Sequence, residues 1–219
     1  MRKIQKMCAA LLAGVMTVGT FAPSVFADEA PAELTDEQVI NVRTTAFGNN
    51  YDVQDMGWRW MMAACYEGLY RDVADENGDE FILAGAESVD ISDDGTVYTY
   101  HLREDAKWSD GVPVTAHDYE YGWKRLLNPD YAYDYASFIY NVVGAEEYNS
   151  GEGSADDVMA VAVDDYTFEV TLKVADPTFE SKLVATPLYP TREDLAEAAG
   201  DNWGKDWTLC VYNGPFCMT

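Results

Sequence analysis

Residues 107–118 read KWSDGVPVTAHD and combine a turn with the start of a helix. The first half of this stretch has the composition of a turn, because Gly111 permits a positive φ and the aspartate before it can bond nearby backbone N–H groups. We expect Trp108 to bury its large ring beneath this turn. Thr115, with Asp118 three residues later, forms the pattern of a capping box, which marks the start of a helix. A turn that leads into a capped helix is therefore the centre of the predicted fold.

Two hairpins are predicted on either side of this centre. Residues 87–91 and 97–102 read as strands around a Ser-Asp-Asp-Gly turn. Residues 158–163 and 167–172 read as a second pair of strands around two aspartates. Apolar residues alternate along the second strand of each hairpin, so each set should share one face: Tyr98, Tyr100 and Leu102, and then Phe168, Val170 and Leu172. This alternation is typical of half-buried strands.

Helices are predicted between and beyond these strands. The capped helix continues to Asn128, where the following proline ends it. An upstream helix is predicted from apolar residues that share one helical face: Trp58, Met61, Met62, Cys65 and Leu69. Two more helices are expected at residues 178–185 and 191–199, the second ended by Gly200, and a short strand is expected at residues 39–45. The class is therefore mixed α/β.

Composition and charge exclude some classes of protein. The 219 residues carry 14 Lys and Arg against 39 Asp and Glu, for a net charge of −25. Apolar residues make up 48% and aromatic residues 13%, which excludes a disordered acidic tail. Nucleic-acid phosphates are bound through Lys and Arg that displace counterions, so the strong negative charge argues against a nucleic-acid partner.

The amino terminus has the pattern of a secretory signal peptide at residues 1–27. Basic residues begin it, an apolar run follows at residues 7–22, and Val25 and Ala27 are the small residues of a cleavage site. A membrane anchor is the alternative, but the run is short for a span and contains glycine and threonine. We predict export to the periplasm or the extracellular cell surface, and an acidic leader at residues 28–38.

Cysteine and histidine usage argues against a metal centre. Beyond the signal peptide the chain has Cys65, Cys210 and Cys217, and an odd number in an exported protein leaves at least one without a partner in the chain. Cys210 and Cys217 could form a disulfide, although their spacing does not guarantee the geometry. Cys65 lies on a predicted helix face and is expected to be a small buried residue. With two histidines and no C-x-x-C pair, no zinc site and no other metal or cofactor is predicted.

Enzyme signatures are also absent from the sequence. There is no G-x-S-x-G elbow, no Walker loop and no H-E-x-x-H pair. Residues 75–79, DENGD, start like a calcium loop, but glycine falls at the fourth position and the twelfth residue is Ala86. We interpret this segment as a surface turn. No enzyme is predicted, and an exported hydrolase remains an alternative.

One set of spaced residues is specific. It leads into residues 107–118 and consists of Ala86, Asp94, Val97, Tyr98, Tyr100, Leu102, Arg103, Asp105 and Trp108. Flanking motifs agree with it: YEGLY at 66–70, YGWKR at 121–125, AEEY at 145–148, AVDDYTFEVTL at 162–172 and YNGPF at 212–216. Together they resemble the family 5 extracellular solute-binding proteins, and in particular the oligopeptide-binding proteins of ABC importers. The resemblance extends from about Val39 to the last residue.

The resemblance implies a type II periplasmic-binding-protein-like fold. Residues 39–66 and 190–219 correspond to part of lobe I, residues 67–189 correspond to an associated α/β domain, and the second lobe is not in the sequence. It implies a monomer that captures oligopeptides and delivers them to permease subunits at the membrane, without covalent chemistry. Other solutes on the same framework remain alternatives, namely a dipeptide, nickel, haem or an oligosaccharide.

The resemblance also indicates ligand-binding residues. Gln54, Asp55, Met56 and Gly57 lie thirteen to ten residues before Glu67 and correspond to the segment whose backbone pairs with the bound peptide. Tyr135, six residues after a proline, matches a tyrosine that lines this site. The alternative for Tyr135 is an ordinary core or surface tyrosine.

Overall fold

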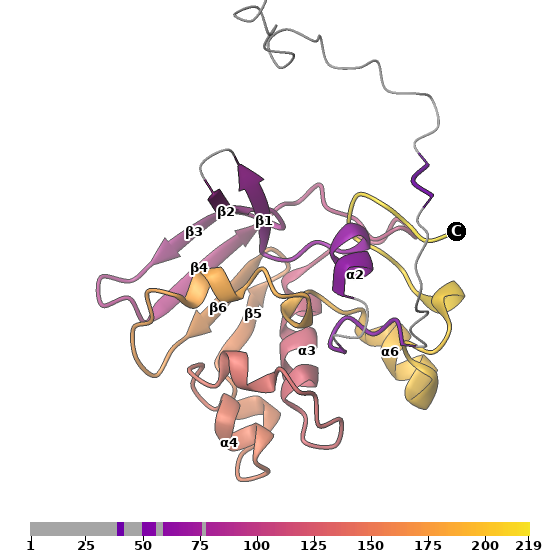
Figure 1. Ribbon diagram of the computed structural model, residues 1–219. Helices are drawn as coiled ribbons and strands as arrows, with labels where there is room; N and C mark the ends of the chain where they lie inside the picture. The colour runs from indigo at the N-terminus through magenta and orange to yellow at the C-terminus, as the bar shows by residue number, and fades with distance from the viewer. Residues whose placement is uncertain (1–38, 42–49, 56–58, 76–77) are drawn as a thin grey trace, which may run out of the picture. The chain divides into compact units, whose positions relative to one another are not determined.

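The computed structural model describes residues 39–41, 50–55, 59–75 and 78–219 (Figure 1). Ala46–Thr219 form one compact unit, and all elements below belong to it. In the other unit, Met1–Thr45, the described residues 39–41 have no regular secondary structure. The rest of the strand predicted at residues 39–45 lies outside the described residues, as do the predicted signal peptide and acidic leader.

A four-stranded antiparallel sheet lies at the centre of the unit. Its order is β3-β4-β6-β5, with β3 at Ala86–Ile91, β4 at Val97–Leu102, β6 at Thr167–Thr171 and β5 at Ala160–Asp164. Both predicted hairpins are therefore confirmed, and β4 pairs with β6 to join them. Tyr100 lies opposite Phe168 across this junction, and both side chains are fully buried.

Helix α3 (Ala116–Leu127) packs on the buried face of this sheet, against β5 and β6 (Figure 1). Its Trp123 is fully buried and meets the Phe168 ring edge-on, with 5.1 Å between the ring centroids. The Trp123 indole N–H donates to the Leu188 carbonyl oxygen over 2.9 Å. These contacts place the centre of the core between α3 and the sheet.

The sequence motif that predicted α3 is confirmed. Asp118 and Thr115 form the capping box, and the helix ends before Asn128, as the following proline predicts. Trp108 is only 2% exposed, so its ring is buried beneath the turn as expected. Gly111 has a φ of 90°, the conformation that the turn requires of glycine.

Three of the other helices are shorter than predicted, namely α2 (Arg59–Cys65), α5 (Phe179–Lys182) and α6 (Glu193–Ala199). The short helix α4 (Ala145–Asn149) was not predicted. The upstream helix ends four residues before Leu69, and Trp58 lies outside the described residues. The helix predicted at 178–185 is reduced to α5, because the backbone is extended at Ala185 with a ψ of 129°, and a short 3-10 turn follows at Thr186–Leu188.

Five single turns of 3-10 helix complete the list of helical segments in the described residues. They are η2 (Ala136–Ile139), η3 (Ala155–Asp157), η4 (Thr186–Leu188), η5 (Gly200–Asn202) and η6 (Trp207–Leu209). Helix α6 ends at Gly200, as predicted. None of the helices in the described ranges combines the length and the apolar character that crossing a bilayer requires.

The structure also contains a separate two-stranded sheet that was not predicted. Strands β1 (Tyr70–Asp75) and β2 (Gly78–Leu83) pair antiparallel, with Asp75 opposite Gly78. Residues 76–77 of the DENGD segment lie outside the described residues, so the surface turn interpreted there stays a prediction. Among the residues that the structure describes, no group of three or more His, Cys, Asp or Glu is placed to hold a metal ion.

The three described cysteines are free thiols. Cys65 is buried, as expected for a small core residue, and burial is the main cause that raises its pKa to about 11. Cys210 is half-buried and Cys217 is exposed, and the disulfide considered between them is not formed in this structure.

Candidate ligand-binding segment

The predicted ligand segment begins in a tight turn at residues 50–55. Asn50 Oδ1 accepts from the backbone N–H of Asp52 over 3.0 Å, and Asp52 Oδ1 accepts from the backbone N–H of Gln54 over 3.1 Å. The backbone N–H of Asp55 donates to the Asp52 carbonyl oxygen over 3.0 Å. Short polar side chains that bond the backbone two residues on are typical of such turns, and here Asp52 organises the whole segment.

Asp52 also forms a buried ion pair with Arg125 of α3. Arg125 Nη1 lies 2.8 Å from Asp52 Oδ2, and the two side chains are only 6% and 5% exposed. The Tyr133 hydroxyl donates to the same Oδ2 over 2.6 Å. Burial works to lower the pKa of the Arg125 guanidinium, but the Asp52 charge and the other contacts outweigh it, and the pKa is raised. Arg125 therefore stays charged in the core.

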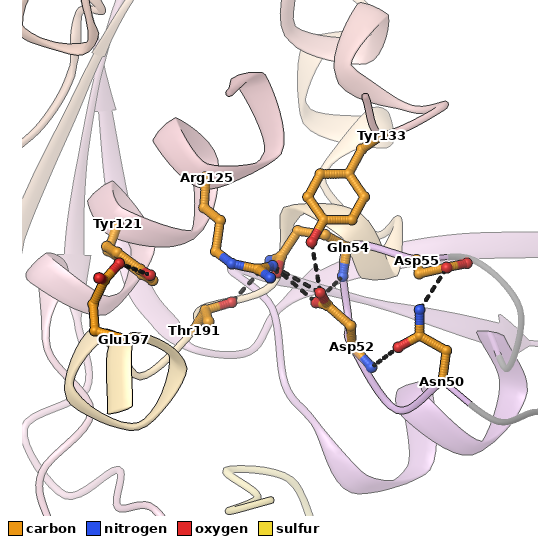
Figure 2. A network of polar contacts seen from close by, with 9 residues as sticks. All are labelled: Asn50, Asp52, Gln54, Asp55, Tyr121, Arg125, Tyr133, Thr191 and Glu197. Atoms are coloured by element: carbon orange, nitrogen blue, oxygen red, sulfur yellow. Dashed lines mark hydrogen bonds and ion pairs between the residues drawn. The ribbon is translucent and has the colours of Figure 1, made fainter. Parts of the chain in front are cut away.

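Gln54 completes this network and connects it to a third segment (Figure 2). Its side chain is 1% exposed. Gln54 Oε1 accepts from Arg125 Nη1 over 2.7 Å, and Gln54 Nε2 donates to Thr191 Oγ1 over 2.8 Å. The turn, helix α3 and the segment before α6 are thus connected by one buried set of polar contacts, and the buried charges have several partners.

Tyrosine rings cover the remaining side of the guanidinium. The Arg125 Cζ atom lies 4.7 Å from the Tyr131 ring centroid and 5.3 Å from the Tyr133 centroid, within the range of cation–π contacts. Burial first, and then the Asp52 charge, raises the pKa of Tyr133, so its hydroxyl keeps its proton and remains a donor. The buried ion pair therefore also orders the segment that leads to Tyr135.

The predicted site residues occupy different environments. Gln54 is buried, Asp55 is exposed, and Tyr135 is half-buried with its ring edge-on to Phe138 at 5.1 Å between centroids. The Gln54 and Asp55 backbone N–H groups donate inside the turn, so a ligand would pair with other main-chain groups of this segment. The predicted residues Met56 and Gly57 lie outside the described residues.

The sequence did not reveal the residues that organise the segment. Arg125 was visible only as the last residue of the YGWKR motif, and Asp52 and Tyr133 gave no signal of their own. Arg125 lies 73 residues from Asp52 and 71 from Gln54 in the sequence. Local spacing cannot pair residues that far apart, although an arginine among apolar helix positions could have suggested a buried partner.

A cavity of about 380 Å³ lies along α3, next to the Asp52–Arg125 network. Arg125 and Tyr131 line it together with Tyr121 and Glu197, whose side chains hydrogen-bond over 2.9 Å. Two other lining residues form an ion pair, with Lys124 Nζ 2.5 Å from Glu120 Oε1. The cavity wall is about equally polar and apolar, and several of its polar groups pair with one another.

Most of the chain matches one known protein family. Residues 80–219 match the family described as "Bacterial extracellular solute-binding proteins, family 5 Middle". The chain belongs to this family. Because the family is described as extracellular, membership supports an exported location for this family 5 chain at that level of detail.

Curated relatives agree with the assignment of the family 5 chain. The dipeptide-binding protein DppE of Bacillus subtilis is 36% identical over 192 residues, which are 86% of this chain and 34% of the relative. The oligopeptide-binding protein OppA of the same organism is 38% identical over 184 residues, 82% of this chain and 33% of the relative. The chain spans about one third of the length of these relatives.

Solved structures confirm the predicted fold class for the family 5 chain. The structure of Listeria monocytogenes OppA bound to peptide superposes with a TM-score of 0.76 at 34% identity, over 83% of this chain and 36% of that one. The substrate-binding domain of an oligopeptide ABC transporter from Bacillus anthracis superposes with a TM-score of 0.73 at 38% identity, over 78% and 33%. The chain therefore has part of the periplasmic-binding-protein-like fold.

Proposed function

We propose that this chain belongs to the solute-binding component of a peptide ABC importer, which captures oligopeptides outside the membrane and delivers them to the permease. The observation that carries the proposal is the superposition on Listeria monocytogenes OppA bound to peptide, at 34% identity over 83% of this chain. The proposed protein acts by binding alone, as a monomer, in the periplasm or at the extracellular cell surface.

The geometry of the turn at residues 50–55 suits ligands of varied sequence. Main-chain hydrogen bonds recognise any peptide, and hydrated pockets accept different side chains. The Gln54 side chain is turned into the buried network, so this residue can offer only its backbone to a ligand. Asp55 is exposed beside it. We therefore assign peptide pairing to the main chain of residues 54–57 and a lining role to Tyr135.

The proposed lobe boundaries have support in backbone contacts. Residues 39–66 and 190–219 are assigned to lobe I, with residues 67–189 as its associated domain. The Gly214 N–H donates to the Cys65 carbonyl oxygen over 2.8 Å, and the Tyr51 N–H donates to the Gly204 carbonyl oxygen over 2.5 Å. These bonds hold residues 50–55 and 59–66 against the last segment, as one lobe requires.

A dipeptide ligand is the second candidate. The relative DppE, at 36% identity, is named as a dipeptide-binding protein, and a Lactococcus lactis relative with the same name is 38% identical over 150 residues. A dipeptide has less main chain to pair than an oligopeptide, so the two candidates differ in how affinity changes with peptide length.

A chimera tests the proposal. Residues 39–219 would replace the matching segment of Bacillus subtilis OppA, and calorimetric titration would compare a dipeptide, a tripeptide and a pentapeptide, with unaltered OppA as the control. We expect the chimera to bind the longer peptides and to prefer them over the dipeptide. Preference for the dipeptide would support the second candidate. A chimera that unfolds cooperatively at the midpoint of OppA but binds no peptide would contradict both.

A further inference from the structure

The two predicted ligand segments meet at one carboxylate. Asp52 Oδ1 accepts from the Gln54 backbone N–H at 3.1 Å, while Asp52 Oδ2 accepts from the Tyr133 hydroxyl at 2.6 Å. Gln54 belongs to the first predicted segment, and Tyr133 lies two residues before Tyr135 in the sequence. A shift of Asp52 would therefore displace both segments together.

Arg125 fixes the position of that carboxylate. One guanidinium nitrogen, Nη1, lies 2.8 Å from Asp52 Oδ2 and 2.7 Å from Gln54 Oε1. Arg125 extends from α3. Trp123, two residues earlier in the same helix, is at the centre of the core. The guanidinium therefore holds the turn in a fixed position relative to the helix. Because the guanidinium is planar, it fixes the direction of these contacts as well as their distances.

We propose that Asp52 and Arg125 are positioning residues for solute capture, whose buried ion pair holds the turn carrying Gln54 and Asp55 in register with the Tyr133–Tyr135 segment. This inference rests on the proposed function, because the ligand roles of Gln54, Asp55 and Tyr135 belong to it.

Burial of the pair favours positioning over stability as its role. Two buried charges lose much of their hydration, and well-packed apolar residues of similar volume often give equal or greater stability. Their benefit is that ionic and hydrogen-bond geometry specifies one arrangement of the groups around them. Replacing both residues by apolar ones should therefore separate the two roles, because apolar side chains can restore the packing but cannot restore the directional contacts of the ion pair.

Amide hydrogen exchange of the full 219-residue chain tests the coupling. Tyr133→Phe removes one hydroxyl and leaves the ring, and Tyr121→Phe is the matched control because its hydroxyl bonds Glu197 instead. We expect Tyr133→Phe to accelerate exchange at Gln54 and Asp55 by about ten-fold or more, as loss of a hydrogen bond to a charged group implies. The control should leave those amides unchanged. Equal exchange in both variants would overturn the proposal.

Peptide titration of the chimera tests the link to the ligand. Arg125→Lys keeps the charge but cannot reproduce the fixed guanidinium geometry, and we expect it to weaken pentapeptide binding by about ten-fold. The double variant Asp52→Leu with Arg125→Met should regain the unfolding midpoint but not the affinity. Tyr121→Phe should bind as the unaltered chimera does.

The outcomes separate this inference from the proposed function. Recovery of affinity together with stability in the double variant would show a structural role and overturn the positioning role alone. If the double variant does not fold, Tyr133→Phe decides, and binding equal to that of Tyr121→Phe would overturn the positioning role. No peptide binding by the unaltered chimera would overturn the proposed function, and the positioning role with it.

Discussion

The indole N–H of Trp108 donates to Oδ2 of Asp118 over 3.2 Å, and the same oxygen accepts from the backbone N–H of Thr115 over 2.8 Å. One carboxylate thus joins the Trp-Ser-Asp-Gly turn to the first turn of α3. Burial raises the pKa of Asp118 while these hydrogen bonds oppose the rise. The stretch with the greatest diagnostic value is therefore a scaffold for the core, and the predicted ligand residues lie elsewhere.

Trp108→Ala should destabilise the fold. The ring is 2% exposed and meets Tyr66 edge-on with 6.3 Å between centroids, so its removal should cost about 3–5 kcal/mol. Chemical denaturation measures this cost, with Trp207→Ala as the control, because Trp207 is 38% exposed and its loss should cost about 0.5 kcal/mol. An unchanged midpoint in Trp108→Ala would favour a ligand-stacking role for the ring instead.

Asp176 should give the protein a pH dependence in acid. Its bond from Lys182 Nζ at 2.6 Å, followed by bonds from Thr178, lowers its pKa from 3.8 to about 2. A carboxyl group with a lowered folded-state pKa stabilises the fold above its unfolded pKa, and this contribution is lost as the pH falls through the folded value. Urea midpoints between about pH 4 and pH 2 should therefore fall less in Asp176→Asn than in the wild type.

Lys182→Met is the companion variant for this experiment, because it removes the largest cause of the pKa shift and leaves the threonine bonds. We expect it to show an intermediate slope. Parallel midpoint curves for the wild type and both variants would contradict the assigned contribution of Asp176.

Gly204→Ala should disturb the turn at residues 50–55. Gly204 has a φ of 71°, and an added Cβ would lie 2.7 Å from the Asp52 backbone nitrogen, where no atom fits. Gly200→Ala is the matched control, since it also has a positive φ, of 50°, but its Cβ would meet nothing within 4 Å. We expect Gly204→Ala to accelerate amide exchange at Gln54 and Asp55 far more than Gly200→Ala does. Equal effects would show that backbone strain alone matters.

Export should remove the first 27 residues. The pattern at Val25 and Ala27 after the apolar run predicts cleavage before Asp28. Amino-terminal sequencing of exported protein should therefore begin Asp-Glu-Ala. A retained amino terminus would favour the membrane anchor instead.

Local signals in the sequence predicted the central fold well. The two main hairpins and α3 depend on turn residues, alternation and a capping box that lie within a few positions of each other. The β1–β2 hairpin escaped prediction because Tyr70 and Val73, three residues apart in β1, break the two-residue alternation of a strand. The helix at 178–185 was overestimated because the chain leaves the helical conformation after α5 and is extended at Ala185, ahead of a 3-10 turn.

The organisation of the candidate site was beyond such signals. Family resemblance indicated Gln54, Asp55 and Tyr135, but the buried contacts that hold them come from Asp52, Arg125 and Tyr133. Their pairing depends on how α3 packs, and a sequence pattern contains no information on which buried charge meets which. The inward direction of the Gln54 side chain was hidden for the same reason.

We propose that the main chain of residues 54–57 and the Tyr135 side chain both contact a bound peptide. A crystal structure of the chimera with bound pentapeptide tests it most directly. We predict hydrogen bonds between the peptide main chain and the backbone of this segment, the Tyr135 side chain in contact with the ligand, and the Asp52–Arg125 pair intact. A bound peptide that touches neither the segment nor Tyr135 would contradict the account.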